Sequence, residues 1–346
     1  MKFGMMITLS LVAFFLTGCG NATQTSDGIT PTPATSNDET ATLLSLEQVD
    51  DYPLYTMRYF GTYPGRDRSD LSKPTVASAQ SSCRVAWGCS LFAALGDGED
   101  RLLGHNFDWH FSPALLLFTD PADGYASVSM VDIEYLGFEG ERSKNLTDLP
   151  LEERRALLDA PSLPFDGMNE KGLAVGMAAV PEEVMPHDPQ KKTLDELEVI
   201  REILDHAATV DEAISILDSF NIDMGEVPIH YLIASASGES AVVEFYQGEM
   251  VVFRNESTWQ VATNFLLAST NGNEQGQCWR YDLLEQRLNE LQGWVSSNDA
   301  LHLLEDVSQD ITQWSIVYHL ASGDLEIVMG QDYSEIHEFH LEQMVP

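Results

Sequence analysis

The chain has 346 residues, of which 44% are hydrophobic, and it carries 55 Asp and Glu against 18 Lys and Arg. Its apolar content excludes a mainly disordered chain, which would lack the apolar surface that offsets the entropy of ordering. The formal net charge of −37 argues against binding to nucleic acid, whose phosphates it repels, and against docking on anionic lipid through a basic surface.

Residues 1–18 are typical of a bacterial lipoprotein signal peptide. Lys2 precedes an almost wholly apolar run over residues 5–16, which is too short to span a bilayer. The run ends in Leu16-Thr17-Gly18-Cys19, which resembles the lipobox, where cleavage before the cysteine leaves a thiol that carries a lipid. We therefore predict lipidation at Cys19 and an extracytoplasmic protein anchored to the cell membrane. The alternative is an ordinary signal peptide with an incidental cysteine.

Residues 19–45 are predicted to form a flexible tether, and residues 46–88 a pro-segment. From Gly20 to Thr42 the chain is rich in Thr, Ser, Asn, Asp and Pro, a composition that cannot build a core. Within the pro-segment, the alternating run from Tyr52 to Phe60 indicates a strand that packs on the domain that follows. That domain, residues 89–346, is predicted to be the catalytic one.

The rest of the chain predicts hairpins, then two helices, then further strands and helices. An apolar run at 89–95 turns at Gly96-Asp97-Gly98 and returns at 101–107, which is a hairpin pattern. Strands are also expected within 125–138, 173–180, 231–235, 241–246, 250–254, 259–264, 313–320 and 325–329, and helices at 194–207, 210–220, 279–291 and 299–307. A capping box at Thr209 and Glu212 opens the second helix. The order suggests two antiparallel sheets with helices outside them.

Four segments carry the candidate chemistry. They are Trp87-Gly88-Cys89-Ser90, Gly104-His105-Asn106-Phe107-Asp108-Trp109, Asp166-Gly-Met-Asn-Glu-Lys-Gly-Leu173 and Ala262-Thr-Asn264. In this order they resemble the choloylglycine hydrolase and penicillin-acyltransferase group, which are cysteine-type N-terminal-nucleophile hydrolases. The resemblance runs from about Pro53 to Met329. It implies an α+β fold, a four-layer αββα sandwich of two antiparallel sheets.

The resemblance also implies a mechanism. A precursor cleaves itself before Cys89, which becomes the new N-terminal residue and the nucleophile. Its α-amino group, with an ordinary pKa of about 7.7–8.0, is then the general base for the thiol. The reaction is attack on a linear carbon–nitrogen amide of a small molecule, through a thioester, followed by hydrolysis or by transfer to another amine. No cofactor and no metal are implied.

Three further residues take roles from the resemblance. Asp108 matches an aspartate that holds the α-ammonium, Asn264 an asparagine of the oxyanion hole, and Arg280, in Cys278-Trp-Arg-Tyr281, an arginine that closes the network. His105 stands where the group usually has arginine. An imidazole with the ordinary pKa near 6.5 is mostly neutral at pH 7, so we expect a neutral hydrogen-bonding role or weakened activity. A second asparagine of bile-salt hydrolases would fall near Ala178, which disfavours a bile-salt substrate.

Two other classes of protein stay open at this point. One is a solute-binding surface lipoprotein without chemistry, and the other is a hydrolase that uses Cys89 and His105 without cleavage. A mature chain beginning at Cys89 would exclude both. Cleavage would also separate the catalytic domain from its anchor. One hypothesis is a Cys83–Cys278 disulfide that joins the two parts, since the compartment outside the membrane permits disulfides. The alternative is two unpaired buried cysteines, with the pro-segment held by packing alone.

Overall fold

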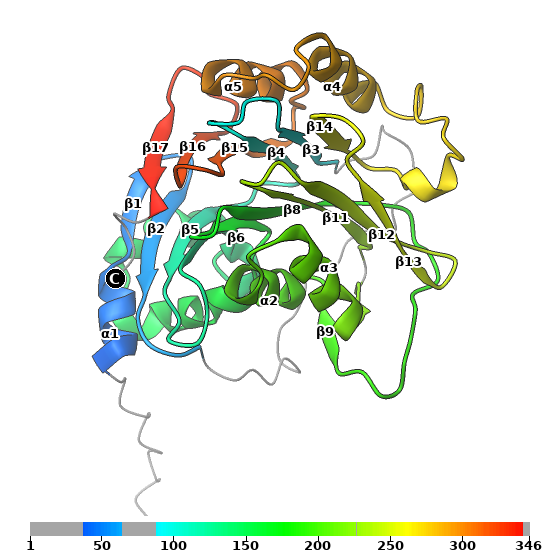
Figure 1. Ribbon diagram of the computed structural model, residues 1–346. Coiled ribbons are helices and arrows are strands. Elements are labelled where there is room, and N and C mark those ends of the chain that lie inside the picture. Colours follow the sequence, from blue (N-terminus) through cyan, green and yellow to red (C-terminus); the bar gives the residue numbers. More distant parts are fainter. Residues whose placement is uncertain (1–36, 64–87, 226, 342–346) are drawn as a thin grey trace, which may run out of the picture. The chain divides into compact units, whose positions relative to one another are not determined.

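The computed structural model describes residues 37–63, 88–225 and 227–341, and two large sheets account for most of its strands (Figure 1). The first sheet has nine strands, in the spatial order β1 (Glu47–Asp50), β2 (Leu54–Tyr59), β5 (Ala114–Thr119), β6 (Ser127–Asp132), β7 (Asp166–Asn169), β8 (Leu173–Ala179), β11 (Ile229–Ser235), β12 (Ser240–Tyr246) and β13 (Glu249–Arg254). The second has six, in the order β14 (Trp259–Ala262), β3 (Ser90–Ala94), β4 (Leu102–Asp108), β15 (Thr312–His319), β16 (Asp324–Met329) and β17 (His337–His340). A small parallel pair is formed by β9 (Thr193–Asp195) and β10 (Asn221–Asp223).

Helices cover the outer face of each sheet (Figure 1). The helices α2 (Glu198–His206) and α3 (Val210–Ser219) pack on the nine-stranded sheet, and α4 (Trp279–Glu290) and α5 (Ser297–Asp306) pack on the six-stranded sheet. The inner faces of the sheets meet through β3, β8, β11, β12 and β14. The layers therefore run helix, sheet, sheet, helix, and the predicted α+β sandwich is confirmed.

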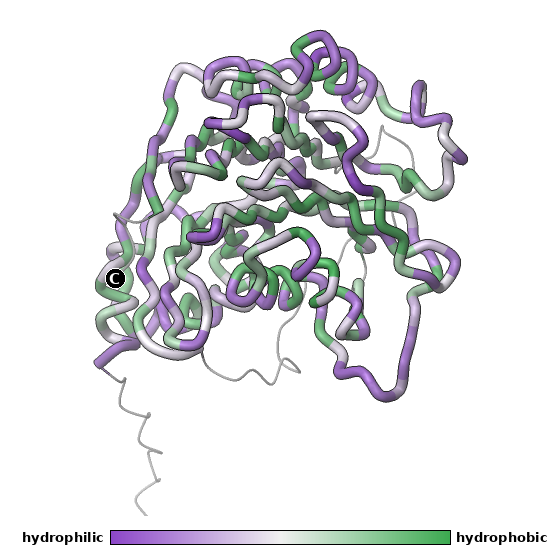
Figure 2. The backbone as a smooth tube through the Cα atoms, in the orientation of Figure 1, coloured by the Kyte–Doolittle hydropathy of each residue, from purple (hydrophilic) through white to green (hydrophobic). Residues whose placement is uncertain are grey.

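The apolar core lies in the two sheets, where hydrophobic residues concentrate (Figure 2). Every residue of β3, β4, β5, β6 and β15 is buried. A strand covered on both faces needs no polar side, so it becomes a continuous apolar run instead of alternating. This explains why β5, with the sequence Ala-Leu-Leu-Leu-Phe-Thr, was not among the predicted strands.

The N-terminal segment is part of this fold. The strand β2 pairs in parallel with β5, from Leu54 opposite Ala114 to Tyr59 opposite Thr119, and Leu54, Tyr55 and Met57 are fully buried. The nine-stranded sheet is therefore mixed and not purely antiparallel as predicted. The helix α1 (Asn37–Leu44), with Thr42 and Leu43 buried, occupies the last part of the range predicted as a tether.

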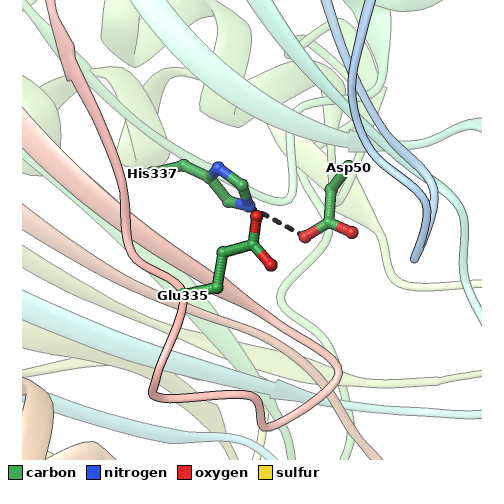
Figure 3. Close-up of side chains that lie close together, drawn as sticks. All are labelled: Asp50, Glu335 and His337. Atoms are coloured by element: carbon green, nitrogen blue, oxygen red, sulfur yellow. Dashed lines mark hydrogen bonds and ion pairs between the residues drawn. The ribbon is translucent and has the colours of Figure 1, made fainter.

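A side-chain cluster links this segment to the other end of the chain (Figure 3). His337 Nε2 lies 2.8 Å from Asp50 Oδ2, and one ligand-type atom from each of Asp50, Glu335 and His337 lies within 4.8 Å of the others. Because β1 is an edge of one sheet and β17 an edge of the other, this ion pair ties the two edges together.

Most local predictions agree with the observed elements. The capping box at Thr209 and Glu212 is confirmed. The helix expected from Leu194 begins only at Glu198, because Leu194 lies in β9. The strand stretch within 125–138 ends at Asp132, whose side chain accepts a hydrogen bond from the Glu134 N–H and caps a 3-10 helix. The 3-10 helices are η2 (Ile133–Leu136), η3 (Gly140–Ser143), η4 (Leu146–Asp148), η5 (Leu151–Ser162) and η6 (Leu267–Ser269).

Several predictions concern residues outside this part of the chain. The signal peptide, Cys19, most of the tether and Cys83 lie outside the described residues. Cys278 is buried and disulfide-bonded, but the pairing with Cys83 stays a prediction. Within the described ranges, no helix combines the length and apolar character that crossing a membrane requires.

Candidate active site at Cys89

Cys89 stands one residue before β3, where the hairpin with β4 places it beside polar side chains. The register pairs Ser90 with Asn106 and Leu91 with His105, and the Gly88 N–H donates to the Asp108 carbonyl at 3.2 Å. Cys89 is a free thiol and is 4% exposed. The predicted hairpin is therefore confirmed, and it brings Cys89 to the strand that carries His105 and Asp108.

Arg280, in the first turn of α4, is buried and reaches across to the backbone at Cys89. Its Nη1 lies 2.7 Å from both the Gly88 and the Cys89 carbonyl oxygens and 2.8 Å from Ser90 Oγ. Its Nη2 donates to Asn264 Oδ1 at 2.7 Å. Burial lowers the pKa of the guanidinium, while Asp108 and Cys89 oppose this effect. One side chain thus fixes the Gly88–Cys89 peptide bond and the candidate oxyanion residue together.

Asp108, at the end of β4, is fully buried. Its Oδ1 accepts from Thr312 Oγ1 at 2.5 Å, its Oδ2 accepts from Gln309 Nε2 at 2.6 Å, and Arg280 Nη1 lies 3.5 Å away. Burial raises the pKa of Asp108 to about 6, and the charge of Arg280 and the two hydrogen bonds work against that rise. The carboxyl group is therefore held in place to receive a positively charged partner.

Asn264 follows β14 and is 8% exposed. Its Oδ1 is taken by Arg280, and its Nδ2 donates to the Ala179 carbonyl at 2.8 Å. An amide nitrogen has two hydrogens, so the second donor of Nδ2 remains for a substrate oxygen. This is the orientation that an oxyanion donor requires, with its acceptor atom turned away from the reacting group.

His105, in the middle of β4, pairs with a residue to which the sequence assigned no role. Its Nδ1 lies 2.7 Å from Asp166 Oδ2, and both side chains are fully buried. Burial lowers the pKa of His105, but the hydrogen bond to Asp166 and the neighbouring Cys89 thiol outweigh this effect and raise the pKa to about 10. The expectation of a mostly neutral imidazole relied on the pKa of an unpaired histidine, and the buried contact with Asp166 favours the charged ring instead.

A cavity opens in front of Cys89. Its wall is mostly aromatic and aliphatic, with Phe107, Trp109, Tyr135, Phe165 and Met177 among the lining residues, and Glu196 on its border. Ala179 also lines it, whereas Ala178 is fully buried. Such a cavity suits an apolar group bound next to a few polar ones.

Part of the chain is similar in sequence to known proteins. Residues 155–268 match the family model described as linear amide C-N hydrolases, choloylglycine hydrolase family. This match covers 114 of the 346 residues, so it is this part of the chain that is similar to the family. A stretch of 111 residues is 32% identical to a penicillin V acylase from Pectobacterium atrosepticum, and it spans 29% of this chain and 29% of that protein.

Solved structures extend the likeness in fold. Penicillin V acylase from Agrobacterium tumefaciens superposes with a TM-score of 0.52 and 16% identity, over 74% of this chain and 87% of that one. A mutant of conjugated bile acid hydrolase from Clostridium perfringens gives a TM-score of 0.53 and 16% identity, over 74% and 93%. At these identities the structures share the fold, and the chemistry of this chain must be argued from its own residues.

The five site residues predicted from the sequence, Cys89, His105, Asp108, Asn264 and Arg280, come together around one peptide bond. Sequence reasoning missed Asp166 and Gln309, which contact His105 and Asp108. Asp166 begins a motif that was recognised, and only its depth in the core gives it a partner. Gln309 lies in a polar loop before β15, and no sequence signal marks it.

Proposed function

We propose that this chain is a cysteine amidohydrolase of the N-terminal-nucleophile type, and that Cys89 is released as the nucleophile by self-cleavage after Gly88. The observation that carries the proposal is the environment of the Gly88 carbonyl. This oxygen accepts from Arg280 Nη1 at 2.7 Å and from Gln309 Nε2 at 3.0 Å. Two donors on one carbonyl, directly before a free thiol, are suited to stabilise an oxyanion on that carbonyl.

Self-cleavage would begin with attack of Cys89 Sγ on the Gly88 carbonyl carbon. The new C–S bond replaces the C–N bond to the Cys89 nitrogen, and the thiol proton passes to that nitrogen. Water then hydrolyses the thioester, which leaves a Gly88 carboxylate, a free thiol and a free α-amino group. Arg280 and Gln309 hold the negative charge on the oxygen while the carbon is tetrahedral.

Gly88 itself supports this assignment. A Cβ at this position would lie 2.7 Å from Asn264 Oδ1 and 2.8 Å from Arg280 Nη2. Any other residue would therefore push apart the two side chains that surround the peptide bond. Gly98 offers a matched control, because the atom nearest to a Cβ added there, Arg101 Nη2, would lie 3.9 Å away.

The released α-amino group of Cys89 would lie near Asp108, because Gln309 Nε2 bonds both the Gly88 carbonyl oxygen, at 3.0 Å, and Asp108 Oδ2, at 2.6 Å. Once protonated, it is a cation beside a buried carboxylate. In its neutral form it takes the proton of the thiol as Sγ attacks an amide carbon of the substrate, and it delivers that proton to the leaving nitrogen. The second hydrogen of Asn264 Nδ2 is the donor proposed for the substrate oxyanion.

The substrate is proposed to be a small amide with an apolar acyl group. The apolar cavity next to Cys89 supports this, and so does the stretch related to a penicillin V acylase. Penicillin V is therefore the first probe, and a conjugated bile acid is the second. Because Ala178 has no amide side chain, we expect the bile acid to be the poorer one.

We also propose that the enzyme is anchored to the cell membrane through lipidated Cys19. Cleavage after Gly88 would leave α1, β1 and β2 on a separate chain. Their buried residues, the pairing of β2 with β5 and the His337–Asp50 ion pair would retain that chain without a covalent bond. The predicted Cys83–Cys278 disulfide would add a covalent link.

A second candidate function is a hydrolase that uses Cys89 and His105 without cleavage. The His105–Asp166 pair favours it, since an oriented imidazole beside a thiol is the arrangement of other cysteine hydrolases. Intact mass and N-terminal sequencing of the purified protein distinguish the two. A chain that begins at Cys89 supports the proposal, and an uncut chain that releases a primary amine from penicillin V supports the second candidate.

The proposal is tested most directly with Gly88→Ala against Gly98→Ala. We expect Gly88→Ala to remain uncut and inactive, whereas Gly98→Ala should be cut and should release amine like the unaltered protein. Normal cleavage of Gly88→Ala would contradict the assignment, because the added Cβ cannot be accommodated without moving Arg280 and Asn264.

A further inference from the structure

Asp166 is a buried carboxylate to which the proposed reaction assigns no role. It lies on β7, in the nine-stranded sheet, and faces His105 on β4 of the six-stranded sheet. The side chains of both residues are fully buried, and Nδ1 lies 2.7 Å from Oδ2. The contact therefore crosses the interface between the two sheets, close to the candidate nucleophile.

Three side-chain donors hold the carboxylate. Tyr318 Oη donates to Oδ1, and Trp314 Nε1 donates to Oδ2 at 3.3 Å, alongside His105 Nδ1. An ionised carboxylate is an acceptor only, and three donors satisfy it. A protonated carboxyl group would instead lose one of these acceptor positions. The cluster is thus built for a negative charge on Asp166.

The other ring nitrogen of His105 is the unsatisfied atom of the cluster. Nε2 is buried and has no hydrogen-bond partner among the described residues. The Cys89 thiol is nevertheless close enough to raise the pKa of His105. In the uncut chain the two groups are neighbours without a well-formed hydrogen bond. A small shift of Cys89 after cleavage would complete one.

We propose that Asp166 is a positioning residue for the reaction: by binding Nδ1 it orients the His105 ring and keeps it positively charged, so that Nε2–H stabilises the Cys89 thiolate. This inference rests on the proposed role of Cys89 as nucleophile. His105 transfers no proton in this arrangement. The thiol proton goes to the α-amino group, and the imidazolium lowers the energy of the sulfur anion that is left.

The groups facing His105 are consistent with this role. Asp166 comes from β7, Cys89 precedes β3, and Asp108 lies on β4, where the charge of His105 opposes the rise of the Asp108 pKa. Tyr318 and Trp314, from β15, contact Asp166. Asp166 thus contacts the imidazole, the Cys89 thiol lies beside it, and Asp108 interacts with its charge from further along β4. A positive charge on the ring is favourable beside the anionic form of each group.

The test measures the reactivity of the Cys89 thiol, which requires no substrate. Iodoacetamide labelling of the peptide that carries Cys89 is followed by mass as a function of pH, in the unaltered protein, in Asp166→Asn and in Glu244→Gln. Glu244→Gln is the matched control, because Glu244 also contacts a histidine, His230, and both of these side chains are fully buried. Proteins are compared in the same state of cleavage, which intact mass reports.

We expect Asp166→Asn to be labelled about tenfold more slowly near neutral pH, since a one-unit rise in the thiol pKa reduces the thiolate tenfold. Glu244→Gln should be labelled within about twofold of the unaltered protein, because it alters no group near the thiol. Asp166→Glu, which keeps the charge, should recover part of the rate. Equal labelling curves for folded Asp166→Asn and the unaltered protein would overturn the proposal.

A second measurement covers the case in which Asp166→Asn does not fold. The His105 ring is followed by NMR through a pH titration of the unaltered protein, with His105→Gln to assign its signal. A ring that stays protonated above about pH 8 supports the proposal, because an unpaired imidazole is neutral there. A neutral ring at pH 7 overturns it. If the chain proves uncut or inactive on penicillin V, the proposed function fails, while both measurements still decide the role of Asp166.

Discussion

The core contains two buried pairs of histidine and carboxylate that resemble each other closely. His105 and Asp166 are 2.7 Å apart, His230 and Glu244 are 2.9 Å apart, and all four side chains are fully buried. In each pair Nδ1 faces the carboxylate, while Nε2 has no hydrogen-bond partner within the described ranges. The geometry of the pair alone therefore does not identify a functional site.

The neighbours of the two pairs differ. Glu244 also accepts from the backbone N–H groups of Leu267 and Ala268, at 2.9 and 3.0 Å, so it fastens the segment after Asn264 to the sheet. Asp166 accepts only from side chains, and its histidine lies beside Cys89. Glu244 thus organises backbone, whereas the proposed role of Asp166 is to organise the candidate nucleophile. Mutations should separate the two roles.

The largest effect is expected at Cys89, which lies beside the His105–Asp166 pair and not beside the His230–Glu244 pair. Cys89→Ala should leave an uncut chain without amidase activity, because it removes the nucleophile of both proposed steps. Cys278→Ala should keep hydrolysis, because its disulfide-bonded sulfur is not part of the proposed chemistry. Intact mass and amine release from penicillin V measure both. Turnover by Cys89→Ala at the normal rate would refute the whole assignment.

The next effect concerns the donors around Gly88. Gln309→Leu should slow self-cleavage by about a hundredfold, since removal of one oxyanion donor costs about this much. Gln313→Leu is the control, because the Gln313 amide also bonds backbone carbonyls, at Trp109 and Ile311, and neither is that of Gly88. Uncut protein is quantified on a gel after timed expression. Equal cleavage of the two variants would remove Gln309 from the mechanism.

The variant His105→Arg tests whether a permanently charged side chain can replace the histidine of the His105–Asp166 pair. We expect this variant to be cleaved and to keep activity within about tenfold, or about 1.4 kcal/mol of barrier. Its activity should also persist at higher pH, because arginine does not lose its proton there. The pH profile of kcat/KM is the measurement. A loss of a hundredfold or more with cleavage intact would mean that the imidazole itself is required.

Glu244→Gln should affect stability alone. Gln has one acceptor oxygen in place of two, so one of the two backbone N–H groups that Glu244 binds loses its acceptor, which costs about 1–3 kcal/mol of unfolding free energy. Its kcat/KM on penicillin V should stay within about twofold of the unaltered protein. Denaturant unfolding and kinetics are measured on the same sample. A kinetic loss as large as that of Asp166→Asn would show that the two pairs do not differ in the way proposed.

What the sequence predicted well was local. The β3–β4 hairpin follows from the Gly96-Asp97-Gly98 turn, and the start of α3 follows from the capping box at Thr209 and Glu212. Cys89, His105 and Asp108 could be placed together because that single hairpin carries them all. The resemblance to a known family then added Asn264 and Arg280, which local patterns could not connect to Cys89.

What the sequence left out depends on contacts between distant residues. Asp166 is separated from His105 by 61 residues, and Gln309 from Gly88 by 221. No pattern in either segment reports the partner that the fold supplies. The same is true of the charge of His105, because the ordinary pKa of histidine applies only until a buried carboxylate is known to face it. The parallel pairing of β2 with β5 is likewise a long-range event.

The last effect we predict is on the pH dependence of stability. The folded pKa of His105, about 10, lies above the ordinary value of 6.5. The pair therefore stabilises the fold fully below about pH 6.5, and this stabilisation is lost as the pH rises toward 10. Burial raises the pKa of Asp108 from 3.8 to about 6, so this residue changes stability at lower pH. Burial also raises the pKa of Asp132, to about 7, so the titration of this residue ends near the start of the range from pH 6.5 to 10. His319, whose pKa is also raised, titrates in both proteins compared below.

Asp166→Asn isolates the contribution of His105 because the other groups are unchanged. Without the carboxylate, burial should lower the pKa of His105, and the ring should then be neutral across the range. We expect the unfolding free energy of the unaltered protein to fall relative to that of Asp166→Asn between about pH 6.5 and 10, by up to about 1.4 kcal/mol for each pH unit. Denaturant unfolding at several pH values measures this difference. Parallel pH curves for the two proteins would mean that Asp166 does not hold the charge on His105, and the distinction between the two buried pairs would then rest on Cys89 alone.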